Sequence, residues 1–112
     1  MIEETILNYL NYHLSAPVYI NAPKNKPEEY FLLEKTGGSL PNKINKATIV
    51  LQAYGKSYYR ASELINEANT AMLEGLVTLD SISEVEINSS YNFTDTTRKE
   101  PRYQSVYVVT HY

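Results

Sequence analysis

Few residues in this chain have the types and spacing that catalysis or metal binding requires. The two histidines, His13 and His111, stand far apart in the sequence, and neither has a cysteine, a second histidine or a carboxylate at metal-ligand spacing. The chain has no cysteine and no Gly-x-Ser-x-Gly motif, so nothing indicates an activated nucleophile. We therefore predict no catalytic residue, no metal site and no cofactor.

The closest acidic pair, Glu84 and Glu86, is expected to share one face of a strand at a separation of about 7 Å. No apolar pocket is predicted beside it, so the pair is typical of a solvated edge and not of a general acid. Residues 94–97 offer oxygen ligands, but one carboxylate rarely holds a metal ion, and a turn is the better interpretation. Gly37 and Gly38 precede a predicted strand and not a helix, which favours a hairpin turn over a phosphate-binding loop.

Length and composition are those of one ordinary globular domain, residues 1–112, with 43% apolar and 21% charged residues. The absence of cysteine favours a cytosolic origin. No apolar run approaches the length of a membrane span, and the acidic start of the chain does not have the pattern of a secretory signal. We expect no membrane association.

The net charge is −3, but its distribution along the chain is uneven. Lysines are frequent between residues 24 and 60, whereas residues 61–97 contain acidic side chains and no basic one. Such a separation suits head-to-tail association around a ring, and an unevenly charged solvated surface is the alternative. Sequence-specific DNA reading is not indicated, because three predicted strands separate the two helices and no helix-turn-helix is available.

Periodicity predicts an α+β fold with the order α-β-β-β-α-β-β. About five strands would form a mostly antiparallel sheet, with both helices packed on one of its faces. Helices are expected at residues 3–14, ended by Pro17, and from Tyr58 to about Leu73 after the N-cap Ser57. Strands are expected at residues 18–20, 30–36, 44–54, 84–91 and 103–112, with loops or turns at 21–29, 37–43 and 92–101.

Tyrosine is the most prominent residue type, with eleven copies, and it suits surfaces that contact other proteins. If the helices cover Ala47, Ile49, Leu51, Val106 and Val108, the other side of the sheet presents a candidate protein interface: Val50, Tyr54, Tyr103, Tyr107 and Val109. The alternative is that the loops at 21–29 and 37–43 fold over this side. Candidate contacts on protruding loops are Gly37, Gly38, Lys43, Thr94, Asp95, Arg98 and Lys99.

Three segments, YFLLEKTGGS at residues 30–39, YNFTD at 91–95 and RYQ at 102–104, resemble a family of small tail proteins. These proteins occur in long-tailed phages and prophages of Gram-positive bacteria and are described as tail terminator or head–tail joining (tail completion) proteins. The resemblance extends over the whole order of elements.

The resemblance implies a homo-oligomer, a hexameric ring in the virion, that caps the tail tube, stops its polymerisation and docks to the neck protein. DNA would pass through the ring, which would lie at the tail–neck junction after assembly in the host cytoplasm. Another neck or minor capsid component remains an alternative within this class. A small ligand-binding or enzymatic α+β domain is the alternative of a different class.

Overall fold

A computed structural model of the chain describes residues 2–39, 45–94 and 100–112. Its elements follow the predicted order: α1 (Ile2–His13), β1 (Val18–Tyr19), β2 (Tyr30–Ser39), β3 (Asn45–Tyr54), α2 (Tyr58–Thr70), β4 (Ile82–Asn92) and β5 (Arg102–His111). A π-helical turn, η2 (Ala71–Gly75), and a 3-10 turn, η3 (Leu76–Thr78), follow α2. The α+β class is therefore confirmed.

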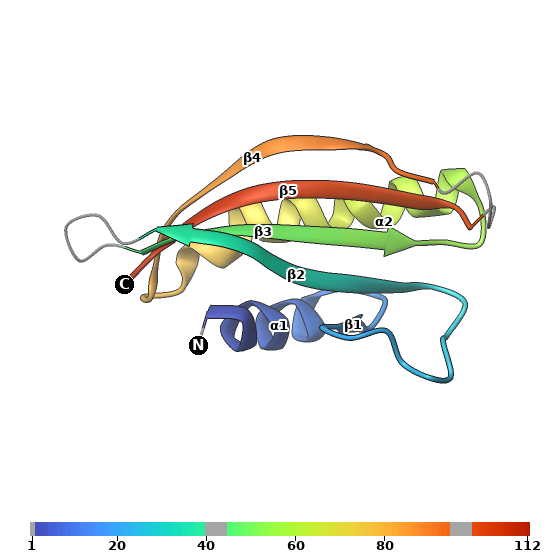
Figure 1. The fold of residues 1–112 in the computed structure, drawn as a ribbon, viewed down its shortest axis with the longest axis horizontal. Coiled ribbons are helices and arrows are strands. Elements are labelled where there is room, and N and C mark those ends of the chain that lie inside the picture. The colour runs from blue at the N-terminus through green and yellow to red at the C-terminus, as the bar shows by residue number, and fades with distance from the viewer. Residues whose placement is uncertain (1, 40–44, 95–99) are drawn as a thin grey trace.

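The five strands of the described residues form one sheet in the order β1-β2-β3-β5-β4, with the four long strands side by side (Figure 1). All neighbouring pairs are antiparallel except the short β1, which runs parallel to β2. The sheet is therefore mostly antiparallel, as the order of the predicted elements indicated. Its edges are β4 on one side and, beyond the two residues of β1, β2 on the other.

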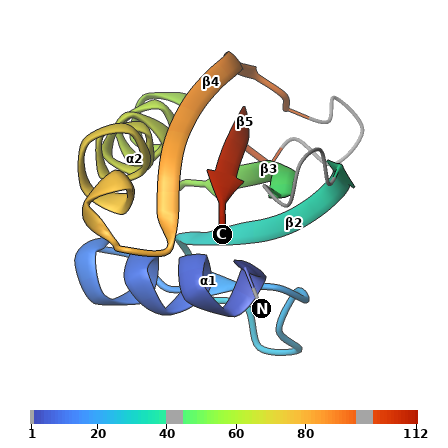
Figure 2. The same cartoon turned by 90° about the vertical axis from the view of Figure 1, so that its left-hand side faces the viewer.

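Both helices lie on one side of the sheet (Figure 2). The helical spacing of apolar residues places Ile6 and Leu10 of α1 and Leu64 and Ile65 of α2 in a single hydrophobic core. The core also contains the inward side chains of β2 and β3, such as Phe31. Burial of each large aliphatic side chain stabilises the fold by about 1.5–3 kcal/mol.

Local contacts hold one end of each helix, and the cap of α2 is the one that the sequence predicted. The Ser57 hydroxyl accepts a hydrogen bond from the Arg60 backbone N–H at 3.0 Å and caps α2. Gly55 lies so close to this first turn that a Cβ there would stand 2.5 Å from the Ala61 nitrogen. At the other helix, the Asn11 side chain bonds both the N–H (2.9 Å) and the C=O (3.1 Å) of Val18, which positions β1.

Two predicted boundaries are wrong. The expected turn at Gly37 and Gly38 belongs to β2, which continues to Ser39 with a shift of register between Lys35 and Gly37. Glycine is common both in turns and in β-bulges, so the glycine pair was interpreted as a turn. Here it lies at a β-bulge, which accommodates glycine without ending the strand. The second helix ends as an α-helix at Thr70 and continues as the π turn η2.

Candidate interaction surface

The sheet has one face that no described helix covers, called here the open face. Its members alternate along the strands with the core residues and are paired with one another across them. On the three central strands they are Tyr30, Leu32, Glu34, Thr48, Val50, Gln52, Tyr54, Arg102, Gln104, Val106 and Val108. On the edge strand β4, Glu84, Glu86 and Tyr91 continue the same face.

Val50 and Tyr54 lie on the open face, as predicted, but each is only 9% exposed. The Tyr54 ring stacks on Tyr30, with centroids 4.6 Å apart and ring planes 8° from parallel. Lys26 and Pro27 line small pockets together with both tyrosines, so the loop after β1 shields this end of the face. The alternative, in which loop 21–29 folds over the face, therefore applies at this one end.

The predicted placement of Tyr103, Tyr107 and Val109 on the open face is wrong. Tyr107 and Val109 are fully buried in the core and Tyr103 packs against it. The physical reason is register: Ile49 pairs with Tyr107 and Ala47 with Val109, and directly paired residues share a face. Both alternating sets of β5 are apolar, so their pattern alone does not distinguish the two faces. Val106 and Val108, which the sequence placed under the helices, occupy the open face half-buried.

A partly buried polar cluster under α2 explains how Tyr107 is accommodated in the core. Its hydroxyl donates to Asn69 Oδ1, which also accepts from the Ser105 hydroxyl at 2.8 Å. The Ser105 and Ser90 hydroxyls lie 2.8 Å apart and link β5 to β4. Burial raises the pKa of the Tyr107 hydroxyl, so it stays protonated and able to donate.

A continuous chain of side-chain hydrogen bonds crosses the open face from β4 to β3 and back to β5. Gln104 Nε2 donates to the Tyr91 hydroxyl at 2.6 Å, and Gln52 Nε2 donates to Gln104 Oε1 at 2.9 Å. The Tyr54 hydroxyl then donates to Gln52 Oε1 and accepts from Arg102 Nη1, both at 3.0 Å. This row fixes polar side chains in one arrangement before any partner binds. In the sequence, this row is indicated only by Gln52 and Gln104, each a polar residue in an otherwise mostly apolar strand.

Arg102 ends this row in an aromatic setting. Its guanidinium carbon lies 4.6 Å from the Phe93 ring centroid and 5.6 Å from that of Tyr54, and its Nε donates to the Phe93 carbonyl at 2.9 Å. Phe93 and Tyr91 meet edge to face and are each 40% exposed. The β4–β5 end of the face therefore combines exposed rings with a held cation, a composition common at protein interfaces.

The predicted protruding loops are described only in part. Thr94 closes the β4–β5 hairpin: its backbone N–H bonds Asn92 Oδ1 at 3.0 Å, and its hydroxyl accepts from the Arg102 N–H at 3.1 Å. Gly37 is exposed within β2. The other candidates on these loops, Lys43, Asp95, Arg98 and Lys99, lie outside the described residues.

The two histidines lie in different surroundings, on α1 and at the end of β5. The His13 ring packs against Tyr9 and Tyr12, with centroids 4.3 and 5.0 Å away, and His111 lies at the end of β5 beside the Tyr112 carbonyl. Among residues 2–39, 45–94 and 100–112, no three His, Asp or Glu side chains are grouped to hold a metal ion.

Glu84 and Glu86 share the open face, as expected, and the hydrogen bond between them raises the pKa of Glu84. Because the folded state favours protonated Glu84, its contribution to stability is present at low pH and is lost as pH rises through this raised pKa. We predict that an NMR titration of the side-chain carboxyl carbons gives Glu84 a pKa above the ordinary value for a glutamate side chain. Glu86→Gln, which removes the charged neighbour, should lower it. An unchanged Glu84 titration in that variant would contradict the pairing.

The charge separation predicted from the sequence is incomplete in the fold. Acidic side chains are exposed along α2 and β4, whereas exposed lysines lie on the loop after β1 and on β2. Lys46 on β3, however, is close enough to Glu84 to favour its ionised form. Arg60 is paired with Glu29 at 3.0 Å, and Lys56 with Glu28 at 3.1 Å. The exposed Lys56–Glu28 pair adds little stability, whereas the Arg60–Glu29 pair is partly buried, and Arg60 Nε donates to both Glu29 carboxylate oxygens at 3.0 Å.

Comparison with known protein families and with curated proteins gives no match to this chain. Within the described residues, no helix has both the length and the apolar character needed to cross a lipid bilayer.

Proposed function

We propose that this chain is a structural virion subunit, a tail terminator or head–tail joining protein. In this proposal copies of the chain form a ring, a hexamer in the assembled particle, at the tail–neck junction. The ring caps the tail tube, stops its polymerisation and docks to the neck protein, and DNA passes through it. The resemblance of residues 30–39, 91–95 and 102–104 to that family suggests the role.

The observation that supports association most directly is the open face. It presents half-buried Val106 and Val108 at its centre and exposed Tyr91 and Phe93 at one end, with no described helix over them. A sheet face of aliphatic and aromatic side chains is a natural contact for another protein surface. The row of hydrogen bonds that ends at Arg102 lowers the cost of ordering side chains on binding, because they are already ordered.

A closed ring requires one heterologous interface made from two different patches of the subunit. In this proposal the open face supplies one patch, and the outer surface of α2, which carries Glu63 and Glu67, lies on the helix-covered side of the sheet and supplies the other. Individually weak contacts become strong when several neighbours are in place, because each further contact forms at high effective concentration. Termination of the tube is then steric: the capped end no longer presents a surface to which the next tube subunit adds.

The experiment mixes the purified chain with the polymerising tail tube protein of the same phage or prophage. We expect electron microscopy to show rings at tube ends and tubes that stop growing, with mean length falling as the chain is added. Analytical ultracentrifugation of the chain alone should show self-association at high concentration. Tubes of unchanged length and bare ends would overturn the terminator role, and particles in which the chain occupies another neck position would assign the alternative component.

A further inference from the structure

The outer edge of β2 is only partly paired. β1 pairs with it at Phe31 and Leu32, after which β2 continues to Ser39. The Phe31 N–H faces this edge, since it donates to the Pro17 carbonyl at 2.9 Å. Backbone groups of alternate residues face the same side of a strand, so the N–H and C=O groups of Leu33 and Lys35 also face it. Within the described part of the chain, no strand pairs with β2 beyond Leu32 at this edge.

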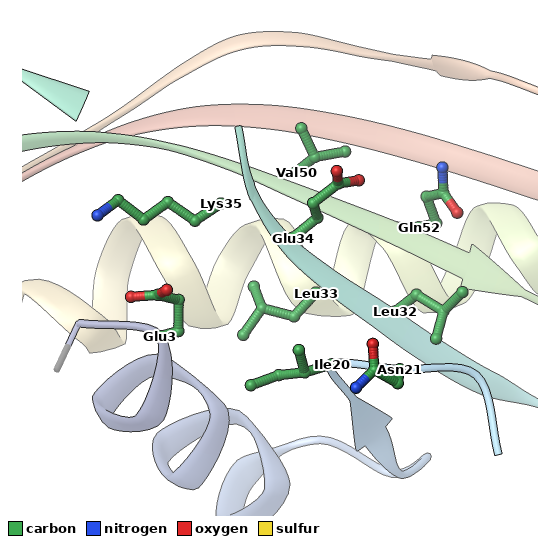
Figure 3. Close-up of a pocket in the computed structure, with 9 residues that line it drawn as sticks. All are labelled: Glu3, Ile20, Asn21, Leu32, Leu33, Glu34, Lys35, Val50 and Gln52. Atoms are coloured by element: carbon green, nitrogen blue, oxygen red, sulfur yellow. The ribbon is translucent and has the colours of Figure 1, made fainter. Parts of the chain in front are cut away.

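A pocket of about 400 Å³ lies at this edge, where β1 ends (Figure 3). Glu3 of α1, with Ile20 and Asn21, lies on one side of the β2 ribbon, and Val50 and Gln52 lie on the other. The β2 residues 32–35 line it with side chains from both faces of the strand. A strand placed about 4.8 Å from β2 would contact side chains of both faces in the same way.

The residues that line the pocket include Glu3, and one of its carboxylate oxygens lacks a hydrogen-bond donor. Glu3 Oε1 is buried and accepts no hydrogen bond from any described residue. Glu34 adds a second carboxylate to the pocket lining, against the single ammonium of Lys35. A buried carboxylate oxygen without a donor is unfavourable, and a lysine or arginine side chain is the donor that best offsets this cost.

We propose that this edge binds an extended, basic segment of another protein, which adds to the sheet beside β2 with a lysine or arginine reaching Glu3. The chain's own described segments suit the site poorly. β4 has a free edge, but it carries Glu84 and Glu86 and no basic residue. Residues 23–27 contain two lysines but start and end with proline, which has no N–H to donate. The inference goes beyond the proposed ring and holds whether or not the ring forms.

The test uses a capped peptide of alternating valine and lysine, five residues long, titrated into ¹⁵N-labelled protein. We expect amide shifts at residues 20–21 and 33–36, and slowed exchange of the Lys35 N–H, because the peptide pairs with this edge. Glu3→Gln should weaken binding about tenfold through loss of the charged acceptor. Glu4→Gln, which changes an exposed carboxylate on the same helical turn, is the matched control and should leave binding unchanged.

Two further probes separate strand addition from simple charge attraction. A peptide methylated on alternate backbone nitrogens keeps its charge but cannot pair, and a valine–glutamate peptide keeps its strand propensity but reverses its charge; neither should bind. Equal binding of the methylated peptide, shifts away from β2, or a Glu3→Gln affinity equal to that of the wild type would overturn the proposal. So would a loss of self-association in Glu3→Gln without peptide, since the occupant would then be a second copy.

Discussion

Replacing Tyr107 with aspartate is expected to unfold the domain. The Tyr107 side chain is 0% exposed, packs in the core and donates to Asn69 of α2. Aspartate there would leave a carboxylate in an apolar site together with the space of the lost ring. We expect a loss of about 4 kcal/mol or more. Since a domain of this size is stable by only about 5–15 kcal/mol, the circular dichroism melt should collapse or shift far down.

Two controls make this result specific to burial. Tyr107→Phe removes only the hydroxyl, and Asn69 Oδ1 keeps its bond from Ser105, so we expect a loss of about 1 kcal/mol. Tyr59→Asp changes a tyrosine that is 75% exposed on α2 and should alter stability by less than about 0.5 kcal/mol. A folded Tyr107→Asp protein whose only defect is weaker self-association would show that this side chain lies on the surface instead.

The elements were predictable because their signals are local. The apolar spacing of α1 and α2 and the alternation along β3 each identify a buried face within one segment. The cap at Ser57 is equally local, since the hydroxyl bonds a backbone N–H three residues ahead. The glycine pair in β2 misled because the same residue type serves turns and bulges, and only pairing with β3 decides between them.

The two faces of β5 were not predictable, because Val106 and Val108 are as apolar as Tyr107 and Val109. Tyr107 can be buried because Asn69, which is distant in the sequence, accepts the hydrogen bond that its hydroxyl donates. The hydrogen-bonded row on the open face has the same origin: Gln52 and Gln104 stand 52 residues apart and meet only through the register of β3 and β5. Long-range pairing therefore determined the composition of the candidate surface, and the sequence alone could not assign it.

Aspartate at both Val106 and Val108 is expected to abolish ring assembly while leaving the subunit folded. Both side chains are half-buried at the centre of the open face, so carboxylates there remain solvated in the monomer. A partner surface would have to desolvate two charges that it does not match. The expected loss is about 2–4 kcal/mol of association free energy, or roughly 30- to 1,000-fold in affinity. Sedimentation equilibrium and the capping of tail tubes measure it.

The matched control is Val77→Asp, which places the same charge on an exposed valine in η3. It should leave association, tube capping and the thermal melt close to those of the wild type. If the double variant still caps tubes and self-associates normally, the open face is not the contact and the subunit must assemble through another surface. If the double variant unfolds, Val106→Thr with Val108→Thr keeps the shape of both side chains and makes them polar without adding charge. An unchanged affinity in that variant would equally exclude the face. Weaker association in a folded protein is the outcome that the uncovered sheet predicts, because apolar contact area is then the driving force.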